Sequence, residues 1–436
     1  MRADVGRTAI RKIYLRLLPL LFLAYFVCYL DRINVGFAAL TMNKDLGFTA
    51  TVYALGATAF FWGYCLFEIP SNIVLEKVGA RIWIARIMIS WGLFSGATAF
   101  VTGGTSFGTI RFLLGVAEAG FFPGMILYFT YWFPARYRGQ VVGWFMTAIP
   151  VAIFLGGPIS TSLMVALDGV LGLAGWRWLF ICEAVPAVLL GVVVLLYLTD
   201  RPAQARWLEP EEREWLLAEL AAERTAVDRV RVYSVLQSLV HWRVLALAII
   251  YLGIGTASLG LVLFLPLMLK QLGLSTLMTG FASAIPYIVG TIGMVICGYV
   301  TDHMRERRWN LFFTCLAAAV GLLAAALLGG SLWALAGLSI ATIGFYGMKT
   351  SFWPLPSTFL SGTAAAAAIA AINSLGNLGG LIGPTAVGWL KDRTGSYEAG
   401  LYFLAGCALV SALVTLLAVH ERRASAEPER VGMASA

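Results

Sequence analysis

Charge is scarce in this sequence. Only 12% of its 436 residues are Asp, Glu, Lys or Arg, whereas 60% are hydrophobic. Soluble globular proteins carry about 25% charged residues, so the composition argues against an ordinary soluble domain. Apolar runs recur along the whole chain, and a run of about 20 apolar residues is typical of a membrane-spanning helix. We therefore expect an integral membrane protein.

Cysteine and histidine are also few and are poorly placed for metal or disulfide chemistry. The cysteines lie inside apolar runs without a CxxC pair, which argues against a disulfide framework and a zinc site. They are Cys28, Cys65, Cys182, Cys297, Cys315 and Cys407. His241, His303 and His420 lie far apart. Since the sequence also lacks a nucleophile elbow and a nucleotide-binding loop, we expect no enzymatic activity, no metal and no cofactor.

Twelve apolar runs are long enough to span a membrane, which predicts an all-α membrane protein with twelve transmembrane helices. The predicted spans are 17–38, 52–75, 82–102, 107–130, 140–165, 177–199, 244–269, 278–301, 309–329, 333–359, 364–389 and 397–419. The first run follows a basic start, but it carries Asp31 and Arg32 and further spans follow, so it is a retained helix rather than a signal peptide.

The net charge of +8 reflects basic loops rather than binding to nucleic acid. Lys and Arg gather at the N-terminus and in the loops after spans 2, 4 and 8. Because basic loops face the cytoplasm, this alternation predicts that both termini are cytoplasmic. Lys391 and Arg393 are an exception, because their loop falls outside in this count.

A hydrophilic stretch divides the spans into two halves. We expect an N-terminal six-helix bundle over 1–199, a cytoplasmic linker over 200–243, a C-terminal six-helix bundle over 244–420 and a disordered tail over 421–436. The linker segment "LEPEEREWLLAELAAER" predicts an amphipathic helix lying against the membrane face or the bundle.

The two halves resemble copies of each other. Aligning "NIVLEKVGAR" with "GYVTDHMRERR" places Glu76 on Asp302 and Arg81 on Arg307. These four residues are candidates for a cytoplasmic gate. Aligning "GFFPG" with "SFWPL" places Glu118 against Lys349. Parallel six-helix repeats with a site at their interface are a transporter design.

Seven of the charged residues inside the predicted spans are candidates for the site or for interhelical pairing, because each costs a few kcal/mol unless it is paired or faces water. They are Asp31, Arg32, Glu68, Arg111, Glu118, Glu183 and Lys349. Arg111 and Glu118 share one helix face about 10 Å apart. The cations suit an anionic substrate, and the carboxylates suit a coupling proton, although Na⁺ fits them too. The alternative is a set of interhelical ion pairs that fix packing, and for Glu68 and Glu183 a structural role is favoured.

Two pairs of polar residues, each spaced four apart on one helix face, are candidate lining groups. Tyr64 precedes Glu68 in span 2, and Asn373 precedes Asn377 in span 11. For Asn377 helix packing is favoured, because it lies in "GNLGGLIGP", where glycines permit close helix contact.

Several motifs together resemble the anion:cation symporter family of the major facilitator superfamily. They include "YLDRINVGFAAL", "RFLLGVAEAGFFPG", "YWFPARYRG" and "INSLGNLGGLIGP", and the likeness runs from residue 16 to residue 420. The segment "FWPLPSTFLSGTAAAAAIAAINSLGNLGG" is most similar to the branch for tartrate, phthalate and 4-hydroxyphenylacetate. The resemblance implies two pseudo-symmetric six-helix bundles with alternating access.

The resemblance also implies residue roles. Asp31 and Glu118 match acids linked to proton coupling, whereas substrate-site positions are matched by Arg32, Arg111, Tyr64, Asn373 and Thr350. From the residues themselves, Lys349 joins the substrate-binding candidates. Ile149 falls where sugar-acid carriers have a glutamine, which favours smaller or aromatic carboxylates.

We therefore expect a monomeric, multi-pass transporter in the inner (plasma) membrane that imports a small organic anion with protons. The carboxylate is expected to be tartrate or an aromatic acid. The alternatives are coupling to Na⁺, a galactonate- or glucarate-like sugar-acid symporter, an organic anion exchanger or exporter, and an anion sensor that does not transport. The last lacks support, because the only sizeable hydrophilic segment is the central linker.

Overall fold

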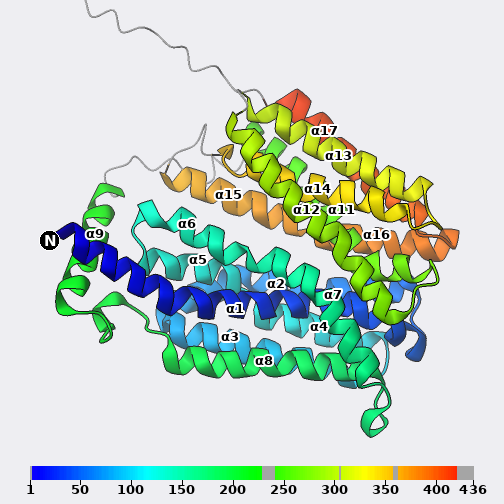
Figure 1. The fold of residues 1–436 in the computed structure, drawn as a ribbon, viewed down its shortest axis with the longest axis horizontal. Helices are drawn as coiled ribbons and strands as arrows, with labels where there is room; N and C mark the ends of the chain where they lie inside the picture. The colour runs from blue at the N-terminus through cyan, green and yellow to red at the C-terminus, as the bar shows by residue number, and fades with distance from the viewer. Residues whose placement is uncertain (1, 228–240, 304–305, 357–361, 420–436) are drawn as a thin grey trace, which may run out of the picture.

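Long helices joined by short connections make up the protein in a computed structural model (Figure 1). The structure describes residues 2–227, 241–303, 306–356 and 362–419, and every regular element within them is helical. The helices before the linker are α1 (Arg2–Asp45), α2 (Ala50–Val78), α3 (Ala80–Ala97), α4 (Gly104–Glu118), α5 (Phe121–Trp132), α6 (Ala135–Met146), α7 (Ala148–Ala166) and α8 (Gly175–Tyr197). Short 3-10 turns cover Thr98–Phe100, Val170–Gly172 and Pro202–Gln204.

The linker contains α9 (Pro210–Val227), and the second half again consists of helices. They are α11 (Trp242–Lys270), α12 (Thr276–His303), α13 (Arg307–Leu327), α14 (Ala334–Phe352), α15 (Gly362–Asn377), α16 (Gly379–Thr394) and α17 (Glu398–Ala418). The tail expected over 421–436 lies outside the described residues.

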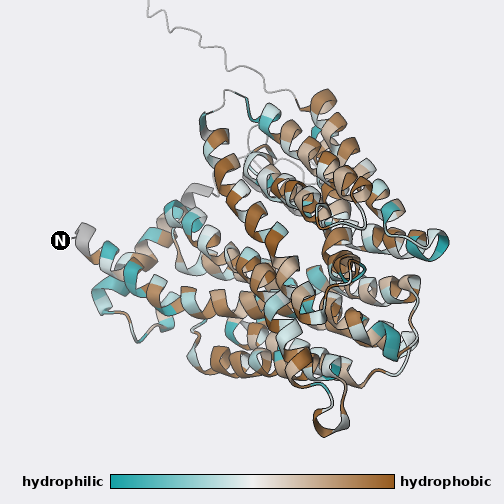
Figure 2. Cartoon of the chain, turned by 45° about the vertical axis from the view of Figure 1, so that its right-hand side comes forward, coloured by the Kyte–Doolittle hydropathy of each residue, from teal (hydrophilic) through white to brown (hydrophobic). Residues whose placement is uncertain are grey.

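Hydropathy confirms the membrane class. Figure 2 shows apolar residues along the middle of most helices, with hydrophilic residues gathered toward the ends. Ten helical stretches in the described residues are long and apolar enough to cross a membrane. The other two expected spans correspond to α14, which carries Lys349, and to α15 with α16, which have 16 residues each. A helix of that length is shorter than the 30 Å hydrocarbon core, so α15 and α16 form one interrupted span.

Three expected continuous spans are in fact broken, and one of them, 140–165, divides into α6 and α7 at Thr147. Span 107–130 divides into α4 and α5 at Ala119 and Gly120, where Gly120 has φ +86°. A Cβ at Gly120 would lie 2.5 Å from the Ser71 Oγ, so only glycine fits this turn. Span 364–389 divides at Leu378. Interrupted helices expose backbone polar groups at membrane depth, which is tolerated where they line a protein cavity.

The two halves meet through α2 with α16, α7 with α12, and α1 with α11. Glycine makes these contacts close. A Cβ on Gly157 of α7 would overlap the backbone of Gly280 in α12, and a Cβ on Gly388 of α16 would lie 2.6 Å from the carbonyl oxygen of Ala50.

Helix α9 packs against the N-terminal half, beside the start of α1 (Figure 1). Ion pairs hold it there. Lys12 lies 2.9 Å from Glu212, Arg136 lies 3.2 Å from Glu219, and Arg138 lies 2.9 Å from Glu223. The amphipathic helix was expected to lie against either the membrane face or the bundle, and in the structure it lies against the bundle.

Candidate functional site

The centre of the site is an ion pair between the first and fourth spans. The Arg32 Nε lies 2.5 Å from the Glu118 Oε1, and Glu118 is only 1% exposed. The Cys28 thiol donates a hydrogen bond to the same oxygen at 3.2 Å. The Arg32 guanidinium also lies 5.1 Å from the Tyr64 ring centroid and 5.2 Å from that of Tyr29. Three candidate residues, Arg32, Glu118 and Tyr64, are therefore brought together.

Arg111 lies on the same side of α4 but has no carboxylate partner. It is 3% exposed, and its guanidinium lies 5.2 Å from the Phe60 ring, while that of Arg32 lies 5.6 Å from the same ring. Its Nε has no hydrogen-bond partner, and within the described residues it forms no ion pair. A buried cation without a counter-charge is costly, so Arg111 is suited to receive an anion from outside the protein.

Asp31 points to a different neighbour. Its carboxylate accepts hydrogen bonds from Trp91 Nε1 at 2.9 Å, Ser95 Oγ at 2.8 Å and Asn34 Nδ2 at 3.3 Å. No Lys or Arg of the described segments lies within ion-pair distance of it. Asp31 is therefore held by neutral hydrogen-bond donors and not by an ion pair. Adjacent helical residues diverge by about 100°, which sends Asp31 toward α3 and Arg32 toward α4.

The substrate-site candidates of the second half are more dispersed. Lys349 is half-buried, lies 5.2 Å from the Tyr346 ring and forms no ion pair within the described chain. The Thr350 hydroxyl donates to the Gly347 carbonyl at 2.8 Å and lies 3.3 Å from the Thr301 hydroxyl, so it faces the contact with α12. Asn373 is half-buried on α15.

The gate candidates lie at or near the ends of helices. Arg81 binds Asp200 through its backbone N–H at 2.7 Å and its side chain at 3.8 Å, and Glu76 is exposed. Asp200 was missed from sequence, although it begins the hydrophilic linker. The side chain of Asp302 lies outside the described residues, and Arg307 begins α13.

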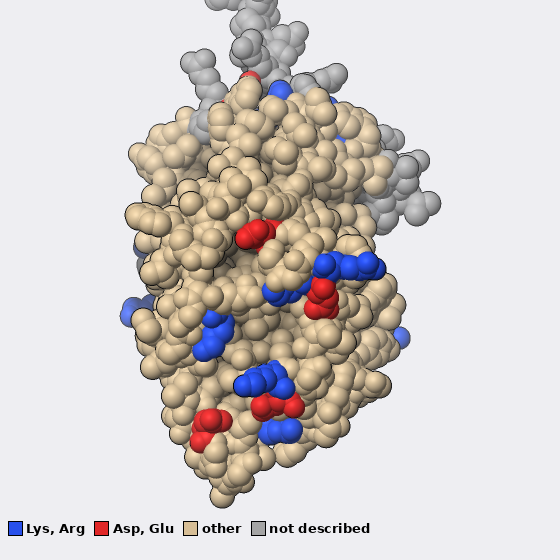
Figure 3. Space-filling view, turned by 90° about the vertical axis from the view of Figure 1, so that its right-hand side faces the viewer, with Lys and Arg blue, Asp and Glu red and all other residues tan. Residues whose placement is uncertain are grey.

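Asp392 joins the two halves at the opposite end of the molecule. Its carboxylate accepts hydrogen bonds from the N–H groups of Ala50 at 3.0 Å and Thr51 at 2.8 Å, which caps the start of α2. Burial would raise the pKa of Asp392, but the hydrogen bonds from Thr51, Thr49 and Ala50 outweigh it and lower that pKa. Figure 3 views the molecule from this side, where ionic groups of both signs are scattered over a mostly uncharged surface.

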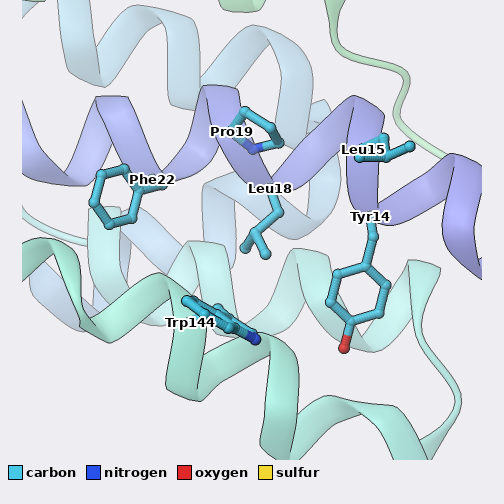
Figure 4. Close-up of a pocket in the computed structure, with 6 residues that line it drawn as sticks. All are labelled: Tyr14, Leu15, Leu18, Pro19, Phe22 and Trp144. Carbon is cyan, nitrogen blue, oxygen red and sulfur yellow. The ribbon is translucent and has the colours of Figure 1, made fainter.

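A surface hollow of about 320 Å³ lies between α1 and α6 (Figure 4). Its lining is apolar apart from the polar edges of two aromatic rings, and it consists of Tyr14, Leu15, Leu18, Pro19, Phe22 and Trp144. Because no charged side chain lines it, this hollow is a poor site for an anion.

Comparison with known proteins identifies the family to which this chain belongs. The model of the Major Facilitator Superfamily matches residues 21–384. The chain belongs to the Major Facilitator Superfamily. The expected fold of twelve transmembrane helices in two pseudo-symmetric six-helix bundles is therefore confirmed, as is the expectation that this superfamily member is a transporter and not an enzyme.

Similar members of the superfamily include both metabolite and drug transporters. A protein of Agrobacterium vitis named "Putative tartrate transporter" is 52% identical over 417 residues, covering 96% of each chain. The "Quinolone resistance transporter" of Acinetobacter baumannii is 42% identical over 415 residues, covering 95% of each. Among solved structures, a bacterial homologue of the lysosomal transporter Spinster in an inward-facing conformation has a TM-score of 0.74 at 17% identity, covering 92% of this chain and 96% of that one.

Proposed function

We propose that this transporter imports a small organic anion, a carboxylate such as tartrate or an aromatic acid, by proton symport with alternating access. The observation that carries the proposal is the buried, unpaired guanidinium of Arg111 beside the ion pair of Arg32 and Glu118. Guanidinium groups bind carboxylates through two parallel hydrogen bonds. The name of the 52% identical relative supports tartrate as the first substrate to test.

The substrate carboxylate is proposed to bind Arg111 and then to compete with Glu118 for Arg32. Tyr64 lies against Arg32 and limits the space beside it. In the second half, Lys349 is the proposed contact for a second carboxylate, since it too forms no ion pair in the described chain. Asn373 and Thr350 are the proposed polar contacts. The Thr350 hydroxyl must leave Thr301 to serve this role.

Proton coupling is proposed to arise because Glu118 and the substrate carboxylate compete for the same partner, Arg32. When Arg32 turns toward the substrate, Glu118 keeps only the Cys28 thiol, and an unpaired buried carboxylate takes up a proton. Glu118 therefore gains a proton as substrate binds and loses it as Arg32 returns. Asp31 is the second proposed coupling site. Its hydrogen-bond donors are all neutral, and it forms no ion pair within the described residues.

Alternating access is supported by where the halves touch. The hydrogen bonds between the two halves, within the described residues, all involve positions 49–58, at the N-cap and in the first turns of α2. The basic loops support a proposed orientation in the inner membrane in which the opposite end, with α9 and the Arg81–Asp200 contact, faces the cytoplasm and both termini are cytoplasmic. The proposed state is thus closed outside. The bundles over 1–199 and 244–420 are the proposed moving bodies, and 200–243 is the linker.

Uptake into vesicles tests the proposal. Labelled tartrate and a labelled aromatic acid are presented to reconstituted protein with and without an inward proton gradient, and then with a Na⁺ gradient. The proton gradient should accelerate uptake and drive accumulation. Asp31→Asn and Glu118→Gln should lose accumulation but keep counterflow, whereas Glu214→Gln, an exposed carboxylate on α9, should behave as wild type. Accumulation by both mutants would refute the coupling assignment.

The second candidate function is exchange or export, which the quinolone-resistance relative favours. It predicts counterflow that a proton gradient does not accelerate in the inward direction. A sensor that does not transport would bind the anion but show neither uptake nor counterflow.

A further inference from the structure

Glu183 on α8 is a buried carboxylate that the proposed coupling scheme leaves unused. It is 4% exposed, and its two oxygens accept hydrogen bonds from Ser160 Oγ at 2.8 Å and from Asn34 Nδ2 at 3.0 Å. It forms no ion pair with any cation of the described segments. A structural carboxylate at this depth would be expected to have a positive partner.

Asn34 joins Glu183 to Asp31. The same Nδ2 that donates to Glu183 at 3.0 Å also donates to Asp31 at 3.3 Å, and Asn34 is fully buried. One amide nitrogen therefore lies within hydrogen-bond distance of two carboxylates. Two carboxylates that share one neutral donor in a buried site repel each other when both are ionised, and they retain a proton between them.

The surrounding groups relieve this repulsion only in part, through neutral hydrogen-bond donors and the more distant charge of Arg111. The donors to the pair are Trp91, Ser95, Asn34 and Ser160, all neutral. Of the nearby charged groups on α1 and α4, Arg32 is bound to Glu118, and Arg111 lies beyond ion-pair distance of both carboxylates. Cys182 adjoins Glu183 on α8, and α7 contributes only the Ser160 hydroxyl. Asn34 Oδ1 is buried without a hydrogen-bond partner, so an acceptor is available beside the pair for a carboxyl O–H.

We infer that Asp31 and Glu183 form one proton-sharing pair bridged by Asn34, and that Glu183 is a further residue of the proton-coupling machinery. The proton moves between carboxyl oxygens of the pair, and no bond other than O–H is made or broken. Asp31 receives three hydrogen bonds and Glu183 two, so the ionised form is better stabilised on Asp31 and the proton rests on Glu183. This inference deepens the proposed proton symport. The existence of the pair is independent of that proposal, and only the role of the pair in transport rests on it.

Infrared difference spectroscopy of the purified full-length protein tests the pair directly. Protonated carboxyl groups give a C=O stretching band that carboxylates lack. Wild type at neutral pH should show this band, and Glu183→Gln should lose part of it, while Glu214→Gln should keep it in full. Glu183→Asp, which retains a titratable group, should restore it. A band that is complete in Glu183→Gln would overturn the inference.

The pH profile of uptake gives the second readout. Replacing Glu183 by Gln removes the group on which the shared proton rests and leaves Asp31 to bind the proton alone, so proton-driven uptake should reach half its maximum about one pH unit lower. Asn34→Leu, which removes the bridge, should shift the profile in the opposite direction, because both carboxylates lose a hydrogen-bond donor. An unshifted profile in Glu183→Gln would refute its role in coupling. If wild type shows no gradient-driven uptake, the proposed symport fails, and the infrared band still decides whether the pair exists.

Discussion

Replacing Arg111 by methionine tests whether the buried charge of this residue binds the substrate or stabilises the fold. Methionine keeps the aliphatic contact with Phe60 and removes a guanidinium that has an unsatisfied Nε and, in the described residues, no ion pair. Exchanging a costly buried charge for an apolar side chain is often neutral or stabilising. The empty Arg111→Met protein should therefore unfold within about 1 kcal/mol of wild type, or be more stable.

Arg32→Met is the matched control. It leaves Glu118, which is 1% exposed, without its cation. Breaking a buried pair by removing one partner costs about 3–5 kcal/mol, and the low exposure means that solvent screening reduces this little. The melting temperature of the empty Arg32→Met protein should therefore fall well below that of Arg111→Met.

Substrate binding, unlike stability, should depend strongly on Arg111. Losing a buried bond between a guanidinium and a carboxylate costs about 2 kcal/mol or more, which is about 30-fold in Kd. The assay is thermal unfolding in detergent over a titration with tartrate and other carboxylates, because a ligand that binds only the folded state raises the melting temperature. If Arg111→Met destabilises the empty protein as much as Arg32→Met, Arg111 has a partner inside the protein. An unchanged Kd would remove Arg111 from the substrate site.

Two further predictions concern residues outside the substrate site. The lowered pKa of Asp392 means that its contact with α2 is complete at neutral pH and weakens only as the pH falls below the ordinary value of about 3.9, so Asp392→Asn should leave the midpoint of the uptake profile between about pH 5 and 8 unchanged. A shifted midpoint would show that Asp392 titrates in that range. Gly120→Ala should lower the melting temperature, since the left-handed backbone alone costs about 1–2 kcal/mol and the new Cβ would clash with Ser71. Gly143→Ala, where a Cβ meets nothing within 4 Å, is the control, and equal melting of the two variants would contradict the argument.

Hydrophobicity predicted most of the fold, because a span must satisfy its backbone hydrogen bonds within one helix. It did not predict the break at Gly120, since a turn that contains only apolar residues and glycine has the same hydropathy as a helix. The interruption at Leu378 was hidden for the same reason.

The site was predicted as a set of residues but not as a set of contacts. Helical periodicity placed Arg111 and Glu118 on one face, yet it carries no information on which neighbouring helix packs there. The sequence therefore did not show that Trp91 and Ser95 of α3 bind Asp31. Asn34 lies three residues after Asp31, a spacing that puts both on one helix face, and that signal was present in the sequence. Asp392 was hidden between Lys391 and Arg393, whose charges violated the expected pattern.

In the proposed alternating access, the glycine contacts between the halves constrain how the halves separate. At Gly157 with Gly280, and at Gly388 with Ala50, backbone atoms rather than long side chains touch across the interface. Dispersion contacts between backbones weaken steeply within about 1 Å of separation. Unlike long side chains, backbone atoms cannot keep contact by changing rotamer as the halves move. Such an interface is either closed or open, with few intermediate positions. A transporter that opens this way passes quickly through the geometry in which water and protons could leak across both faces at once.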